Sequence, residues 1–295
     1  MTTGIFPAAK LVPAPGGILD GAQAVHEHAD SWGQWTNGSF GWLSEACPVN
    51  LILADYCSNT GEGTIANSDA APGEGWPFGI ITKYDCLTVG IKVDEAKEIA
   101  LRQNRAGTQK ALEWELWTGG IATAAGHISD RYLSSSASID VTPGGGPVEV
   151  EKGVAALEQA LADCGLGVQG VIHMSRSAAS AAATKDAVRW YDGKFLTTLH
   201  TPVIAGVGYD PNVVRATAPP TEGPITPPDP VGPAPTTQWM YASGPVVVHL
   251  GPSEIINIQP MVNIVTNEIT VLAGRPAALI YDSCCTFAVN VDLEK

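Results

Sequence analysis

The sequence predicts an α+β fold, and three observations lead to this prediction. A run typical of a β-strand, 78–90, leads directly into a helical pattern over about 94–118. Helical and strand patterns then alternate over about 150–235. From residue 246 onward the chain consists of short segments rich in β-branched residues, separated by turn residues.

The composition is typical of a loop-rich globular subunit. A chain of 295 residues with 45% hydrophobic residues is long enough to bury a large core in one or two domains. Only 16% of the residues are charged, whereas glycine (32) and proline (22) are abundant. We therefore expect much irregular structure and a surface that neighbouring subunits partly cover.

The charge and the hydropathy exclude several classes of protein. The net charge of −14 argues against a protein that wraps nucleic acid, because gripping phosphates requires clustered Lys and Arg. No apolar run is long enough to span a membrane, and the first residues lack a basic segment followed by an apolar one. We expect a soluble protein without a signal peptide.

The first 47 residues carry three tryptophans and show little periodicity, which predicts an extended N-terminal arm. Such an arm cannot bury its tryptophans by itself, so we expect it to lie along other parts of the chain or on a neighbouring subunit. A short apolar run over 49–54 predicts a strand. The polar, glycine-rich segment 58–75 predicts a long mobile loop, which could form an extended hairpin together with 78–90.

The helix over about 94–118 begins with acidic residues, which the helix dipole favours, and Asp94 is a natural N-cap. Gly107 interrupts its pattern. The interruption predicts either one kinked helix or two pieces, with Thr108 capping the second.

After a glycine-rich boundary at 141–147, the pattern predicts a compact α/β subdomain over about 150–235. Its expected elements are a helix over 154–164, a strand over 168–174, a helix over 178–190 and a strand over 203–207. The segment 219–235 contains eight prolines, which exclude a helix or a strand ladder and predict a stiff exposed loop. A ligand for a proline-recognition domain is the less favoured alternative.

The tail is expected to be a series of strands, with turn positions at Asn267 and Gly274. The expected strands cover 246–250, 255–265, 268–272, 277–281 and 287–293.

Six cysteines are too few in a chain of this length to indicate a disulfide scaffold, and none forms a Cys-x-x-Cys motif. We expect reduced and mostly buried thiols. The adjacent Cys284 and Cys285 would point to opposite faces of a strand, so they are not expected to pair with each other.

One weak motif could bind a metal. His26 and His28 could supply two ligands, with Cys47 or Cys57 as a third. They lie in the arm and lack a second pair at the right spacing, so we expect no metal site.

Two further patterns are equally weak. Gly206 and Gly208 follow a strand, but the third glycine and the helix of a dinucleotide site are missing, so a tight turn is favoured. A scattered triad could use Cys164 or Ser175 with His173 and an aspartate. His173 lies in a predicted buried strand, where a hydrogen-bonded core histidine is the usual case. We expect no catalytic or cofactor-binding residues and therefore no enzyme.

In its order of features the chain resembles the major capsid proteins of tailed phages, which share the Hong Kong 97-type fold with encapsulins. The features are an arm with tryptophans, a long loop, the strand 77–90, a helix ending in Glu113-Trp-Glu-Leu-Trp-Thr-Gly119, a central α/β part and a β-rich end. The segment 196–209 is similar to the strand pair of the central domain in such shells. The segments 239–248 and 275–293 are similar to their returning strands.

The resemblance implies an N-terminal arm, an extended loop (E-loop), a peripheral (P) domain and an axial (A) domain. The implied boundaries are an arm over 1–47, an extended hairpin loop over 48–90, a peripheral domain with the long helix over 91–149, an axial-type subdomain with the proline-rich loop 219–235 over 150–235, and a returning β-rich segment over 236–295.

The function that the resemblance implies is a major capsid protein that assembles, in the host cytoplasm, into the icosahedral head shell of the virion. The implied partners are its own copies in hexamers and pentamers, a portal, decoration proteins and enclosed double-stranded DNA that is bound without sequence specificity. No membrane is implied. The alternatives are a phage tail or decoration protein, an encapsulin-like compartment and, less favoured, a Cys/Ser–His hydrolase.

We expect the subunit contacts to involve large aromatic side chains of the arm, the loop and the helix. For the tryptophans at the end of the helix, Trp114 and Trp117, core packing is the more common role. The residues proposed for subunit contacts are Trp32, Trp35, Trp42, Trp76 and Trp117.

Overall fold

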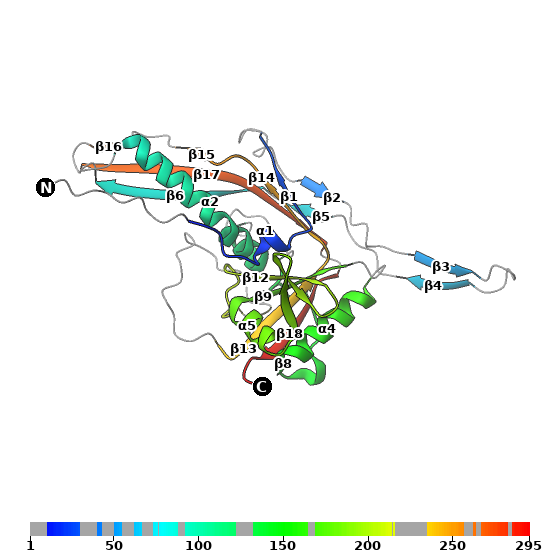
Figure 1. Ribbon diagram of the computed structural model, residues 1–295. Helices are drawn as coiled ribbons and strands as arrows, with labels where there is room; N and C mark the ends of the chain where they lie inside the picture. Colours follow the sequence, from blue (N-terminus) through cyan, green and yellow to red (C-terminus); the bar gives the residue numbers. More distant parts are fainter. Residues whose placement is uncertain are drawn as a thin grey trace.

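A computed structural model describes two large sheets, one long helix and two further two-stranded sheets (Figure 1), and the predicted α+β class is confirmed. The described residues are 11–29, 40–42, 50–54, 62–66, 73–75, 77–87, 92–121, 132–164, 169–213, 215, 235–256, 262–263, 267–282 and 285–295.

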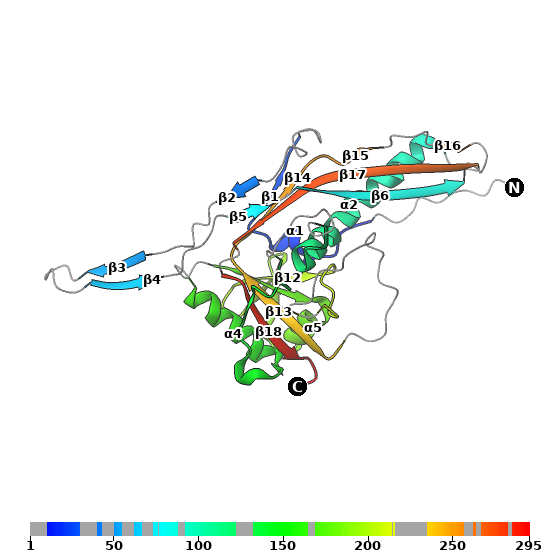
Figure 2. The same ribbon diagram turned by 180° about the vertical axis from the view of Figure 1, so that it is seen from behind.

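A six-stranded sheet with a long helix on one face forms the elongated half of the molecule (Figures 1 and 2). Its elements are β1 (Ala24–Glu27), β6 (Phe78–Leu87), α2 (Val93–Thr118), β14 (Val246–Leu250), β15 (Glu254–Ile255), β16 (Val262–Asn263) and β17 (Glu268–Tyr281). The strand order is β1-β14-β17-β15, and β6 and β16 also pair with β17. The small residues Ala96 and Ala100 of α2 pack closely against Val271 and Ala273 of β17, so the helix lies flat on this sheet.

An eight-stranded sheet forms the rounded half. Its strands are β7 (Ile139–Asp140), β8 (Val148–Glu149), β9 (Val171–Ser175), β10 (Val188–Tyr191), β11 (Lys194–Thr197), β12 (Pro202–Gly206), β13 (Thr237–Ser243) and β18 (Phe287–Asp292). The order is β10-β11-β12-β9-β13-β18-β7, with β8 also beside β18. The helices α4 (Val150–Asp163) and α5 (Arg176–Thr184) bury apolar side chains such as Leu157 and Ala182 against this sheet. A short 3-10 helix, η2 (Pro143–Gly145), precedes β8.

The two halves share one apolar cluster. It contains Val248 of the six-stranded sheet, Ile204 and Tyr241 of the eight-stranded sheet, and Leu112 and Trp117 at the end of α2. All five side chains are at most 1% exposed. Burial of this size favours one continuous body, because separating the halves would return large apolar side chains to water.

Two short antiparallel pairs form small sheets of their own. One joins β2 (Phe40–Trp42) to β5 (Gly73–Gly75), and the other joins β3 (Asn50–Ala54) to β4 (Glu62–Ala66). In both views the β3–β4 hairpin lies well outside the rest of the molecule (Figures 1 and 2).

Helix α2 is one continuous helix, so the two-piece alternative does not apply. It begins at Val93 after Lys92, one residue before the expected start, and Asp94 is not its N-cap. Gly107 is helical, and the hydroxyl of Thr108 donates to the carbonyl of Asn104 at 2.9 Å instead of capping a second helix. Gly119, at φ 62°, ends the helix, and its N–H donates to Glu115 O.

The sequence suggested an extended hairpin between the segment 58–75 and the strand beginning at Phe78. Among the described residues this strand, β6, has a different partner. It pairs over ten positions with β17, which is one unbroken strand through Gly274. Gly274 therefore does not lie in a turn, because the pairing between β17 and β6 keeps this segment extended. Asn267 does occupy a turn, with a left-handed φ of 54°.

Several other expected elements are confirmed, most of them with shifted ends. The helix expected over 154–164 is α4, the strands expected over 168–174 and 203–207 are β9 and β12, and those over 246–250 and 287–293 are β14 and β18. The helix expected over 178–190 is wrong in its second half. The chain leaves α5 at Thr184, takes a left-handed φ of 55° at Asp186 and continues as β10.

The described part of the N-terminal arm lies on its own chain, which is one of the two locations expected for it. A short helix, α1 (Ile18–Gly21), is buried, with Ile18 at 0% exposure. It is followed by β1, which pairs in parallel with β14. The proline-rich segment 219–235 lies outside the described residues except for its last residue.

Cys164 and Cys285 form a disulfide, so the expectation of reduced thiols is wrong for this pair. The bond connects the end of α4 to the residues before β18 across a sequence separation of 121. Cys86 is free, and the other three cysteines lie outside the described residues. The separation explains why local spacing gave no sign of this pairing.

Removing the disulfide should destabilise the protein. We expect the free energy of unfolding of the variant with Cys164→Ala and Cys285→Ala to be lower by about 2–5 kcal/mol, because the cross-link restricts the unfolded chain. Guanidinium unfolding without reductant measures the difference, and Cys86→Ala is the matched control. An unchanged midpoint in the double variant would contradict the assignment.

Gly107→Ala should stabilise α2. The position is helical and exposed, and a Cβ there would contact nothing within 4 Å, so the gain in helix propensity should be about 0.5–1 kcal/mol. Thermal unfolding measures it. Gly153→Ala is the contrasting control, since its Cβ would collide with Val291 and Met240 and should lower the midpoint. A lower midpoint for Gly107→Ala would show that the helix is interrupted there.

Candidate functional site

A buried carboxylate joins three parts of the chain. Glu113 on α2 is 0% exposed. Its Oε1 accepts the N–H of Ile18 at 2.9 Å, and its Oε2 accepts the N–H of Gly208 at 2.8 Å. The arm, the long helix and the turn after β12 therefore meet at one side chain, and we call this place the arm junction.

Further hydrogen bonds hold the arm residues that precede α1. Gln109, one turn before Glu113, donates from Nε2 to Ala14 O at 2.9 Å. Arg176 of α5 donates from Nη1 to Pro15 O at 2.7 Å. The N–H of Ala205 in β12 donates to Gly16 O at 2.8 Å. The arm is thus held by α2 and by the eight-stranded sheet together.

Two glycines make the close approach at the arm junction possible. A Cβ at Gly17 would collide with the side chains of Gln109 and Glu113. A Cβ at Gly208 would collide with the backbone carbonyl of Lys110 on α2. The Gly206–Gly208 pattern is therefore a close turn against a helix, as favoured from the sequence, and no helix begins within residues 207–213, which are the described residues that follow it.

Burial raises the pKa of Glu113 to about 7, because the desolvation of the carboxylate outweighs the N–H groups of Gly208 and Ile18 that favour its charged form. The carboxylate is therefore close to half-protonated at neutral pH. A raised folded-state pKa means that its contribution to stability is complete below the ordinary value of 4.5 and is lost as the pH rises through 7.

His173 is a hydrogen-bonded core histidine, as expected. It is 0% exposed, and its Nδ1 and Nε2 lie 2.9 Å from Tyr209 Oη and from Ser243 Oγ. The Ser243 hydroxyl donates to Gly244 O, so it accepts from Nε2–H, and Nδ1 accepts from the tyrosine hydroxyl. Burial lowers the pKa of His173 to about 3, which keeps the ring neutral.

The hydrolase alternative loses its candidate groups in this structure. Cys164 has no free thiol because it is in the disulfide. The hydroxyl of Ser175 accepts the N–H of Ala178 as the N-cap of α5, and both ring nitrogens of His173 are already occupied. The structure does not bring these residues together as a triad.

The histidines proposed for metal binding lie beside a third histidine. The rings of His26 and His28 stack on His249, with centroids 5.0 and 5.2 Å apart. Cys47 and Cys57 lie outside the described residues. Within the described part of the chain, no group of three His, Cys, Asp or Glu side chains could hold a metal ion.

The structure describes two of the five tryptophan positions proposed for subunit contacts. Trp117 is 1% exposed, stacks on Tyr209 at 4.5 Å and meets Tyr241 edge-on at 4.8 Å, so it packs in the core of its own chain. Trp42 lies in β2, where only the backbone is described. Three positions lie outside the described residues: Trp32, Trp35 and Trp76. Contacts between subunits through these four residues stay a prediction.

The β10–β11 hairpin exposes aromatic and aliphatic surface that the sequence reasoning missed. Trp190 is 48% and Tyr191 61% exposed, and Leu199, just after the hairpin, is 72% exposed. The strand β10 is the outermost strand of its sheet among the described residues. Exposed aromatic residues on an outer strand are typical of a contact surface.

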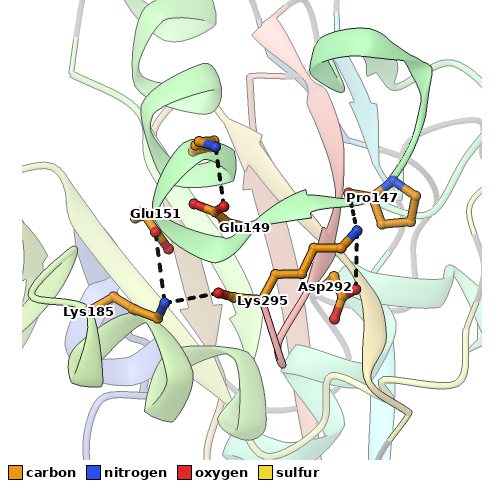
Figure 3. A network of polar contacts seen from close by, with 7 residues as sticks. Pro147, Glu149, Glu151, Lys185, Asp292 and Lys295 are labelled. Carbon is orange, nitrogen blue, oxygen red and sulfur yellow. Dashed lines mark hydrogen bonds and ion pairs between the residues drawn. The ribbon is translucent and has the colours of Figure 1, made fainter.

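Figure 3 shows a second polar network, around Lys295. Lys295 Nζ lies 3.3 Å from the carboxylate of Asp292 and 3.1 Å from Pro147 O. Lys185 Nζ lies 3.1 Å from Lys295 O and 4.0 Å from Glu151. These groups are partly exposed, so the network positions the end of β18 beside α4 and α5 but adds little stability.

Sequence reasoning also missed the arm junction. A signal was present, because Gln109 and Glu113 fall on the same helical stripe as Leu112 and Leu116. A polar pair within an apolar stripe requires buried partners. The partners themselves, Ile18 N and Gly208 N, are each 95 residues away in sequence.

The comparisons with known proteins identify the fold. No family model and no curated protein matches the sequence. A chain of Mycobacterium phage Ogopogo is 12% identical, with 98% of this chain and 94% of that chain covered at a TM-score of 0.52. A chain of Gordonia phage Cozz is 8% identical, with coverages of 99% and 90% and a TM-score of 0.51. The capsid of a native GTA particle gives 10% identity, coverages of 99% and 94% and a TM-score of 0.51.

The chain therefore has the Hong Kong 97-type capsid fold, and the resemblance to phage capsid proteins is confirmed at the level of the fold. At these identities the likeness concerns architecture. No helix within the described ranges is both long and apolar enough to cross a membrane.

The titration of Glu113 gives a pH-dependent stability difference. Glu113→Gln keeps the shape of the neutral acid but cannot ionise, so the wild type should gain about 3 kcal/mol relative to this variant as the pH falls from 8 to 4. Urea unfolding of both proteins across this range measures the difference. Glu98→Gln, an exposed position on the same helix, is the control. A difference between wild type and Glu113→Gln that does not change with pH would refute the raised pKa.

Proposed function

We propose that the chain is the subunit of a self-assembling icosahedral shell, the major capsid protein of a tailed phage head. The observation that carries this proposal is a capsid fold shared over at least 98% of the chain with two phage chains and a GTA capsid. Its function is then structural, and its functional site is the surface that contacts other copies of the same chain.

We assign the domains of the fold as the sequence suggested. The arm covers 1–47, the extended loop 48–90, the peripheral domain 91–149 and the axial-type subdomain 150–235, with 236–295 returning through both. The separate β3–β4 hairpin supports the extended loop, and α2 on its sheet supports the peripheral domain (Figure 1). In this assignment β17 and β18 carry the returning chain through the two halves.

The isolated chain leaves surface that assembly would cover. The β3–β4 hairpin is separate from the body, and the β10–β11 hairpin exposes Trp190 and Tyr191. We propose that neighbouring copies cover both hairpins, together with the tryptophans of the arm and the loop. Burial of these hairpins and tryptophans between neighbouring copies provides the apolar contact area that a stable interface needs.

The remaining partners follow from the proposed role. We propose that the shell encloses double-stranded DNA without sequence-specific contacts, as a net charge of −14 favours weak contact with phosphates. A portal and decoration proteins would be its other partners in the virion. The GTA capsid has the same fold, so the contents of the purified particle, phage DNA or other cargo, decide between a phage head and another container.

The proposal is tested by particle assembly. Size-exclusion chromatography and negative-stain imaging of the purified chain should show closed megadalton shells. Replacing residues 50–66 by a short Gly-Ser linker should leave a folded chain that forms no shells, because the backbone of the β3–β4 hairpin lies well outside both halves (Figures 1 and 2). The same linker inserted between Gly144 and Gly145, where a Cβ would meet nothing, is the matched control and should still assemble. A wild-type chain that stays a monomer would overturn the proposal.

A further inference from the structure

One segment of the arm contacts both halves of the molecule. It comprises residues 14–27, which contain α1 and β1, and we call it the strap. In both views α1 lies between the six-stranded sheet and the eight-stranded sheet (Figures 1 and 2). The hydrogen bonds of the strap show which groups of each half hold it.

Two parts of the strap are bound to the rounded half. The carbonyl groups of Pro15 and Gly16 accept hydrogen bonds from α5 and β12, at 2.7 and 2.8 Å. Helix α1 then lies closely on β12, because a Cβ at Gly21 would collide with the side chain of Ile204. These positions of the strap are therefore fixed relative to the eight-stranded sheet.

The positions between and after them are bound to the elongated half. Helix α2 holds the strap through Gln109, which donates to Ala14 O, and through Glu113, which accepts the N–H of Ile18. Beyond α1 the strap continues as β1, which pairs with β14 along its whole length. Because the contacts with the two halves alternate along the strap, one half cannot rotate against the other while the strap stays docked.

Two of the chain connections between the halves form a narrow crossing. The connection from β13 to β14 lies beside the connection from β17 to β18. The N–H of Gly244 donates to Asp282 O at 3.2 Å, and the N–H of Asp282 donates to Pro245 O at 3.4 Å. A few residues at such a place can absorb the changes in φ and ψ of a hinge motion.

The apolar cluster that the halves share favours their contact, but the hydrophobic effect has no preferred direction. Hydrogen bonds do have preferred distances and angles. The strap makes hydrogen bonds with both halves, and it also contributes Ile18 to the shared cluster. It therefore adds the directional contacts that select one angle between the halves.

We propose that residues 14–27 act as a conformational strap, which fixes the angle between the two halves while it is docked and permits a hinge motion at Gly244 and Asp282 when it is released. This proposal concerns a single chain and does not depend on the proposed function. Its consequence for assembly rests on that function. Copies with a docked strap meet their neighbours at one angle, and a released strap lets the angle vary between copies.

Hydrogen–deuterium exchange of the purified chain measures the release of the strap. In Gly17→Ala the added Cβ collides with the side chains of Gln109 and Glu113. The protection of amides in residues 18–27 should therefore fall by about tenfold, the size expected when a buried hydrogen bond is lost. Gly146→Ala, where a Cβ would contact nothing within 4 Å, is the matched control and should keep the protection of the wild type.

A second variant releases the strap from the other half and serves if the first does not fold. Arg176→Ala removes the side chain that donates to Pro15 O, at an exposed position of α5. Its control is Arg189→Ala, which removes an exposed arginine from β10. Unchanged protection of residues 18–27 in both strap variants would overturn the proposal, because these contacts would then not hold the strap.

Double electron–electron resonance measures the angle between the halves in the same variants. Spin-labelled non-natural amino acids replace Lys83 of β6 and Ala155 of α4, which are exposed and lie on different halves. Labelled chain is mixed with an excess of unlabelled chain, so that only distances within one chain contribute, whether or not shells form. The wild type and the controls should give one narrow distance distribution, and the strap variants a broader one.

Two results of this measurement would overturn the proposal. One is a strap variant that loses protection over residues 18–27 but keeps the narrow distribution, because the strap would then not set the angle. The other is a broad distribution in the wild type. A narrow wild-type distribution that broadens in the strap variants supports the strap even if the chain forms no shells, so its failure and that of the proposed function are distinguishable.

Discussion

The side chain of Glu113 satisfies two backbone N–H groups that would otherwise be buried without partners. One belongs to Ile18 of the arm and the other to Gly208 in the turn after β12. An unpaired buried N–H costs about 1–3 kcal/mol, so the contact with Ile18 favours the docked position of the arm, together with the hydrogen bonds at Ala14, Pro15 and Gly16. Burial also removes the carboxylate of Glu113 from water, and this desolvation raises its pKa. The docking of the arm, the position of α2 and the join between the two halves all depend on this place.

The long strand β17 gives the elongated half its shape. It pairs with β6 on one side and with β14 and β15 on the other, and α2 lies along it. This sheet and the eight-stranded sheet meet in one apolar cluster near the arm junction. The backbone of the β3–β4 hairpin lies well away from it (Figures 1 and 2). A self-sufficient body with a separate projecting hairpin suits a protein that builds a larger assembly from identical copies.

Local patterns predicted most single elements but not their pairing. The segments rich in β-branched residues at 246–250 and 287–293 were correctly predicted as strands, and they are β14 and β18. Gly274 was predicted to lie in a turn because glycine favours turns. The ten residue pairs between β17 and β6 keep this segment extended instead. The helix predicted over 178–190 extends too far, because an alanine-rich segment carries no local signal for the residue at which the helix ends. The disulfide and the arm junction were not predictable from local spacing, since their partners lie about a hundred residues apart or more.

The central claim is that each copy keeps residues 15–28 on its own core and extends the β3–β4 hairpin to a neighbour. A cryo-electron microscopy map of assembled particles, traced through 15–28 and 50–66, tests this most directly. The account predicts a closed shell in which Ile18 contacts Glu113 of the same copy and the hairpin lies on an adjacent copy. A hairpin folded back on its own body, or an arm exchanged between copies, would contradict it.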